Sequence, residues 1–80
     1  MDKDIADKFL FELGHKLASF RKKKNLSYRE LAQLCSVDHS KISKIEKGQV
    51  NVQMLTILEL AKGLGIHPRK LLDFEFEFED

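Results

Sequence analysis

The feature that most constrains the fold of this chain is a pair of short helical patterns, at residues 27–34 and 38–47, separated by only three residues. Ser27 and Glu30 have the spacing of a capping box, in which each side chain accepts a hydrogen bond from the other residue's backbone amide. Asp38 is placed to cap the second helix. The apolar positions of both patterns are spaced for two helices that cross over one core. These positions are Leu31, Leu34, Val37, Ile42 and Ile45.

The outward positions of the second pattern are polar and mostly cationic. They are His39, Ser40, Lys41, Lys44 and Lys47. Ala32, a small residue, allows the second helix to approach the first closely. We interpret the pair as a helix-turn-helix whose second helix, about residues 38–47, enters the major groove of DNA.

The distribution of charge supports a partner that carries phosphate. The 80-residue chain has a net charge of only +1. Residues 15–50, however, hold nine lysines or arginines and three acids, whereas residues 73–80 hold five acids and no base. A basic middle segment with an acidic end is typical of a protein that meets phosphate on one side. The alternative is a solvated surface on which the asymmetry is accidental.

The remaining sequence predicts further helices. Residues 4–24 carry one apolar stripe, with a possible break at Gly14, and Asn25 is a suitable C-terminal cap. The stripe consists of Ile5, Phe9, Leu13, Leu17 and Phe20. Gly48 is expected to end the helix at 38–47. A chain of about this size has a small core, so dimerisation would add to its stability.

A fourth helix is expected over about residues 52–63, with Asn51 as its N-cap and Gly65 after its end. Its core side chains should be Met54, Ile57, Leu58, Ala61 and Leu64. A fifth, short helix should begin near Pro68, with His67 at the N-cap. The expected fold class is therefore all-α.

The last segment, residues 73–80, changes period. Phe74, Phe76 and Phe78 alternate with glutamates, which is the pattern of a half-buried strand. No other segment of the chain has strand character, so an exposed phenylalanine edge would invite pairing with another molecule. We expect a two-fold dimer in which the two tails pair, or each tail covers the other subunit, with Leu10 and Phe11 supplying further surface. The alternative is a frayed acidic tail.

Several classes of protein and site are not expected. The single Cys35 excludes an intramolecular disulfide, fits a reducing cytosol, and is better explained as a small buried thiol than as a redox group. No apolar run is long enough to span a membrane, and the N-terminus has no signal-peptide pattern. The acids and His15, His39 and His67 show no catalytic or metal-binding spacing. We expect a cytoplasmic protein that is not an enzyme, with no cofactor, metal or small-molecule ligand.

Residues 13–72 resemble the Cro/repressor-type helix-turn-helix domain, the XRE family with the lambda-repressor-like fold. The most specific segments are LSYRELA, ISKIEKG and LTILELAKGLGI. The resemblance implies a five-helix DNA-binding domain at 13–72. Residues 1–12 would form a helical N-terminal extension, and residues 73–80 a short β-like tail that serves in dimerisation.

The resemblance also implies roles for individual residues. Base edges would be contacted by His39, Ser40 and Lys44. Phosphates would be contacted by Tyr28, Lys41, Lys47, Gln49 and Asn51. Arg21 and Glu46 match a charge pair that ties the first helix to the end of the recognition helix, for which a bidentate geometry is suited.

We therefore predict a sequence-specific transcriptional regulator that binds double-stranded DNA as a homodimer on a near-palindromic operator. One alternative is an antitoxin or restriction-modification controller whose tail binds a partner protein. A second alternative is a protein-interaction module that no longer binds DNA.

Overall fold

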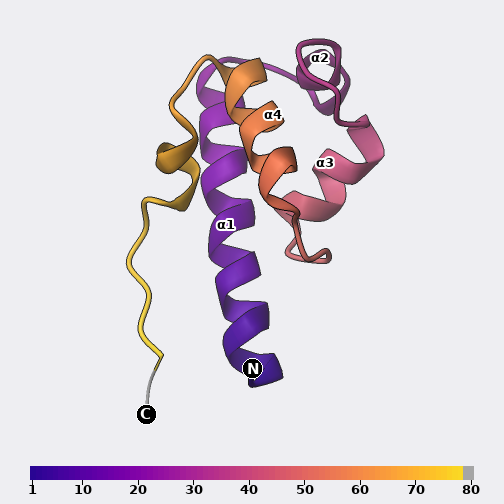
Figure 1. Ribbon diagram of the computed structural model, residues 1–80. Coiled ribbons are helices and arrows are strands. Elements are labelled where there is room, and N and C mark those ends of the chain that lie inside the picture. Colours follow the sequence, from indigo (N-terminus) through magenta and orange to yellow (C-terminus); the bar gives the residue numbers. More distant parts are fainter. Residues whose placement is uncertain (79–80) are drawn as a thin grey trace.

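The chain folds into helices arranged around one core (Figure 1). The computed structural model describes residues 1–78, so the last two residues of the predicted tail lie outside the described part. The helices are α1 (Lys3–Lys23), α2 (Tyr28–Gln33), α3 (His39–Glu46), α4 (Met54–Leu64) and the 3-10 helix η1 (Pro68–Leu72). The all-α class is confirmed. The fifth predicted α-helix is a 3-10 helix instead, so the described residues contain four α-helices.

Helix α1 is continuous, and the possible break at Gly14 is not present. The glycine is required by a crossing of helices. A Cβ atom at position 14 would lie 2.5 Å from the backbone carbonyl oxygens of both Ile45 and Glu46. The absence of a side chain therefore allows the end of α3 to rest directly on α1.

Three helices end in the same way, with a left-handed residue after the last turn. These residues are Asn25 (φ 57°), Gly48 (φ 72°) and Gly65 (φ 69°), the three ends that the sequence indicates. In each case the next backbone amide donates to a carbonyl in the last turn. The pairs are Leu26 to Arg21 (3.1 Å), Gln49 to Lys44 (3.0 Å) and Ile66 to Ala61 (3.0 Å).

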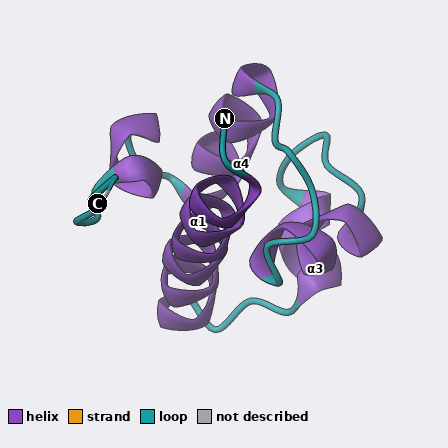
Figure 2. Ribbon diagram, turned by 90° about the horizontal axis from the view of Figure 1, so that it is seen from below, coloured by secondary structure: helices purple, strands orange, loops and turns teal. Residues whose placement is uncertain are grey.

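The helices contact one another in a closed ring, in the order α1, α3, α2, α4, η1 and back to α1. Figure 2 shows α1 between η1 and α3. The buried apolar side chains form one cluster inside the ring. They are Leu13, Leu17, Leu31, Val37, Ile42, Ile45, Ile57, Leu60, Ala61, Leu64 and Leu71. Each element thus contributes to the same core.

Three predicted core residues are exposed instead. Leu34, Met54 and Leu58 expose 50%, 70% and 51% of their surface. Helix α4 begins at Met54, and its N-cap is Gln53 and not the predicted Asn51. The Gln53 side chain makes no capping hydrogen bond. Successive helical residues are about 100° apart. With Ile57 facing the core, Leu58 therefore turns toward solvent.

The tail does not form a strand, so the predicted strand is wrong for residues 73–78. The tail instead runs beside the first half of α1 (Figure 1). The ring centroids of Phe74 and Phe76 lie 5.2 Å and 5.3 Å from the centroid of the Phe9 ring. Leu10 and Phe74 also pack against the core cluster. Of the five residues predicted for a dimer interface, only Phe11 and Phe78 remain exposed, because α1 offers the tail an apolar surface within the same chain.

Candidate nucleic-acid interface

Helix α2 is only six residues long and depends on its cap. Isolated helices of fewer than about 12 residues are marginal in water. The Ser27 hydroxyl accepts from the Glu30 amide at 3.0 Å, and the Glu30 carboxylate accepts from the Ser27 amide at 2.8 Å. This is the predicted capping box, and it fixes the first helix of the helix-turn-helix.

The turn between α2 and α3 is held from outside by α4. The Ser36 amide donates to a Glu59 carboxylate oxygen at 3.0 Å, and Asp38 caps α3 by accepting from the Ser40 amide at 3.0 Å. Helix α4 comes close because of Gly63, where a Cβ atom would lie 3.0 Å from a Leu31 methyl group. No pattern in the sequence indicates the roles of Glu59 and Gly63. These two residues lie close to the turn only in the folded chain.

Helix α3 separates a buried side from a solvent side. Ile42 and Ile45 are buried, and Ser40 and Lys44 lie on the opposite side of the helix, one turn apart. The other predicted DNA-contact residues from this region are exposed or, for His39, partly exposed. They are His39, Lys41, Lys47, Gln49 and Asn51. The fold therefore presents the predicted base contacts on a rigid, cationic surface.

Arg21 and Glu46 join α1 to the end of α3, as the resemblance implies. The Arg21 Nε and Nη2 atoms donate to the two Glu46 carboxylate oxygens at 2.6 Å and 2.9 Å, and Nη1 donates to the Leu26 carbonyl at 2.7 Å. The two side chains are only 11% and 6% exposed. The hydrogen bonds to Glu46 raise the pKa of the Arg21 guanidinium above its usual value, so it stays charged. This pair fixes α3 relative to α1.

Tyr28 has a second partner that the sequence did not indicate. Its ring lies under the Arg21 guanidinium, with 4.4 Å between the guanidinium carbon and the ring centroid. Cation–π contacts of this kind add to the attraction between the two side chains. The ring of Tyr28 thereby extends the Arg21 network to the start of α2.

A cavity of about 380 Å³ lies beside this network. Tyr28 and Lys47 line it together with His15, Ser19 and Lys22 from one face of α1. The remaining lining residues are Ala18 and Glu46, and the Glu46 carboxylate is occupied by Arg21. The cavity is thus surrounded by hydrogen-bond donors and cations, as a phosphate site requires. The i, i+3, i+4 spacing of residues 15–22 is the signal that could have indicated Lys22.

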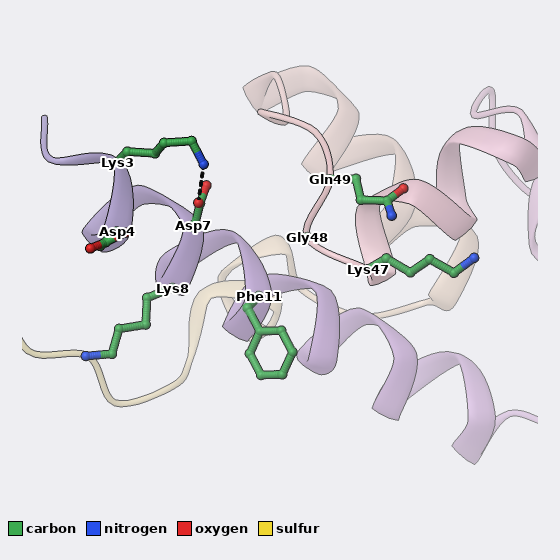
Figure 3. Close-up of a pocket in the computed structure, with 8 residues that line it drawn as sticks. All are labelled: Lys3, Asp4, Asp7, Lys8, Phe11, Lys47, Gly48 and Gln49. Carbon is green, nitrogen blue, oxygen red and sulfur yellow. Dashed lines mark hydrogen bonds and ion pairs between the residues drawn. The ribbon is translucent and has the colours of Figure 1, made fainter.

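The N-terminal extension of α1 meets the loop after α3 at a second cavity, of about 650 Å³ (Figure 3). Gly48 allows the approach, since its Cβ atom would lie 3.2 Å from the backbone of Phe11. Figure 3 shows the Lys47 side chain directed away from Lys3 and Asp7 at the start of α1. Lys3 is paired with Asp7 at 2.7 Å, which raises the pKa of Lys3. With two carboxylates in its lining, this cavity is less suited to phosphate than the first.

Cys35 and His67 each make a local hydrogen bond. Cys35 is partly buried, and its thiol donates to the Leu31 carbonyl at 3.3 Å. No group of three or more metal-ligating side chains comes together within residues 1–78. Over the same residues, no helix is both long enough and apolar enough to cross a membrane. His67 caps η1 by accepting from the Arg69 amide at 3.1 Å.

Comparisons with known proteins agree with this geometry. Residues 12–74 match the family described as a helix-turn-helix domain. The control protein C.BamHI of Bacillus amyloliquefaciens is 40% identical over 62 residues, which cover 76% of each chain. The crystal structure of the restriction-modification controller protein C.AhdI from Aeromonas hydrophila is 42% identical with a TM-score of 0.75, covering 78% of this chain and 94% of that one. The clp gene regulator ClgR from C. glutamicum is 30% identical with a TM-score of 0.74, covering 80% and 83%.

Proposed function

The chain belongs to the helix-turn-helix domain family, whose similar members are DNA-binding regulators and not enzymes, and from that premise we propose how it binds its operator. Helix α3 enters the major groove, where Lys44 donates to guanine and His39 and Ser40 contact neighbouring base edges. The observation that carries this proposal is the exposed side of α3, opposite the buried Ile42 and Ile45. The Arg21–Glu46 pair holds that side in a fixed orientation.

Phosphate contacts surround the recognition helix on two sides. Lys41, Gln49 and Asn51 are exposed beside α3 and on the loop that follows it. Tyr28, Lys47 and Lys22 share the cavity between α1, α2 and the end of α3, and we propose that one backbone phosphate binds there. Each phosphate neutralised in this way releases counterions, so affinity should fall as salt rises.

We infer that the protein binds as a homodimer, because a few base contacts of ~1–3 kcal/mol each give a single domain little selectivity. The tail residues that the sequence predicts for the interface are mostly covered within the chain. The outer side of α4 offers a better surface: Met54, Leu55 and Leu58 expose 70%, 74% and 51%. Two copies joined through α4 would place two recognition helices on a near-palindromic site, with half-sites about one helical turn apart.

The similarity to two controller proteins favours a particular kind of regulator. C.BamHI and C.AhdI are 40% and 42% identical to this chain, and the match to C.AhdI covers 94% of that chain. We propose that this chain regulates transcription in the manner of such controllers, with restriction-modification genes as the first candidates for its targets.

Selection from random double-stranded DNA with the purified full chain tests this function. The expected product is a motif of two related half-sites about one helical turn apart. Titrations of the selected site at several salt concentrations should then give an affinity that falls linearly on a log–log plot. Recovery of unrelated sequences, together with binding that does not respond to salt, would contradict the proposal.

A further inference from the structure

We propose that the tail, residues 73–78, is a docking edge for an extended, basic segment of another protein. The surface is separate from α3, and only Asn51 of the proposed phosphate contacts within the described residues borders its groove. The inference therefore goes beyond the proposed function and is tested separately. The evidence comes from the backbone of the tail, from the apolar groove beside it, and from its charge.

The backbone of the tail has unused hydrogen-bonding groups. Within the described residues, the Phe74 amide is the one backbone group of the tail with a backbone partner, the Leu72 carbonyl at 3.1 Å. Phe74 and Phe76 face α1, whereas Glu75 and Glu77 are exposed. A segment with one covered side and free amide and carbonyl groups is the surface to which a partner strand adds.

An apolar groove of about 650 Å³ runs between the tail and the start of α1. Phe9, Phe76 and Phe78 line it, with Phe76 at 5.3 Å and 84° to Phe9 and at 5.6 Å and 87° to Phe78. Phe78 exposes 66% of its surface and Met1, also in the lining, exposes 90%. Apolar groups exposed together in this way indicate a surface that a partner covers.

The charge around the groove selects the partner. Asp73, Glu75 and Glu77 lie on the tail, and residues 1–12 add four more acids against two lysines. One of these lysines, Lys3, is already paired with Asp7. A partner that inserts apolar side chains here therefore gains if its alternate side chains are lysine or arginine.

A second copy of this chain is a poor occupant of the same edge. Suppose that two tails paired as antiparallel strands with all their phenylalanines on the same face. Glu75 of one tail would then lie opposite a glutamate of the other tail. Like charges directly opposite destabilise a strand pair. A shift by one residue would remove that repulsion, but it would turn the phenylalanines of one tail to solvent. The tail therefore favours a basic partner over itself.

Fluorescence anisotropy of a labelled peptide with alternating lysine and valine, titrated with the full chain, tests the inference. We expect saturable binding that weakens by about tenfold or more in the double variant Glu75→Lys, Glu77→Lys and by a smaller factor in Phe78→Ala. Phe11→Ala is the matched control, because Phe11 is exposed on a different side of α1, against His15, and should leave binding unchanged. A peptide with the same lysines and valines in two blocks should bind more weakly than the alternating one.

Equal binding of both peptides, or no loss in the Glu75→Lys, Glu77→Lys variant, would overturn the proposal. It would also be overturned if Phe78→Ala abolished self-association in sedimentation velocity, since a second copy would then occupy the edge. DNA binding of the Phe78→Ala variant, whose charge is unaltered, should match that of the original chain. A failure of the DNA-binding function is therefore separable from a failure of this inference.

Discussion

At the scale of single residues, Gly14 and the Arg21–Glu46 pair decide how α3 is mounted on α1. Gly14 has no side chain at the crossing of the two helices, and the ion pair joins α1 to α3 about two turns further along α1. Neither effect acts within one helix. Both depend on backbone and side-chain atoms that are more than 20 residues away in the sequence.

Replacing Gly14 with alanine should lower the free energy of unfolding by about 1–3 kcal/mol, the usual cost of forcing atoms into a packed contact. The added Cβ atom would meet two carbonyl oxygens at 2.5 Å. Urea denaturation followed by circular dichroism measures the change. Ser19→Ala is the control, because Ser19 is exposed on the same helix and alanine has the higher helix propensity. Equal effects of the two substitutions would contradict the role assigned to Gly14.

The buried ion pair should show strong coupling in a double-mutant cycle. Arg21→Met alone and Glu46→Leu alone each leave one charge buried without its partner, which costs about 3–5 kcal/mol. The double variant removes both charges and should cost less than the sum of the two single changes. Unfolding free energies from the same urea titrations give the coupling. Additive losses would mean that the two side chains stabilise the fold independently.

At the scale of elements, α3 is a short helix that functions because its neighbours hold it. The buried side of α3 rests on the core, its start is capped by Asp38, and the turn before it is tied to α4 through Glu59. The residues proposed to contact DNA can therefore be separated into those that would select bases and those that would hold phosphates.

Lys44→Ala should cost ~1–3 kcal/mol on the selected operator and much less on random DNA, because Lys44 is assigned to a base edge. Lys47→Ala should weaken binding to both DNAs by a similar factor and reduce the salt slope by about one. Gel-shift titrations of each variant on both DNAs measure the difference. Equal losses on specific and random DNA for both variants would refute this division of roles.

Lys22→Ala should behave like Lys47→Ala, because both lysines line the cavity assigned to a phosphate. Lys23 is the matched control: its ammonium lies 5.4 Å from the centroid of the Phe20 ring, outside that cavity. Lys23→Ala should change the salt slope less than Lys22→Ala does. The reverse order would remove Lys22 from the phosphate contacts.

The elements show what a sequence of this kind can and cannot predict. Caps such as Ser27 and left-handed ends such as Asn25 are local, and the structure contains them as predicted. Gly14, by contrast, suggests a break in α1 when only the neighbouring sequence is considered. The reason for the glycine is the end of α3, a distant segment that approaches it in the fold. The tail has the alternation of a strand, but Phe9 covers its phenylalanines within the chain. Periodicity predicts which side chains are buried, but it does not identify the segment that buries them.

At the scale of the whole molecule, residues 1–78 carry two apolar surfaces outside the core that a partner could cover. One is the outer side of α4, with Met54, Leu55 and Leu58, and the other is the groove beside the tail. Their separation on the fold allows the chain to join a second copy through α4 and a different protein through the tail. The DNA-binding side of α3 stays free in both cases.

Leu55→Glu combined with Leu58→Glu should shift the protein toward a monomer, because burying two carboxylates in an apolar interface is unfavourable. Sedimentation velocity over a range of protein concentrations measures the shift. Both side chains are more than half exposed in the single chain, so the fold should survive the change. Phe78→Glu is the control and should leave self-association as it is. The opposite result would move the dimer interface to the tail.

The closed ring of helix contacts also has a consequence for how the domain unfolds. Every element in the ring touches two neighbours, so the release of any one of them opens two interfaces and exposes the shared core. Unfolding should therefore be all-or-none for the segment from Leu13 to Leu71. The first two turns of α1 and the tail lie outside the ring, and they can open by local fluctuation while the recognition helix stays in place.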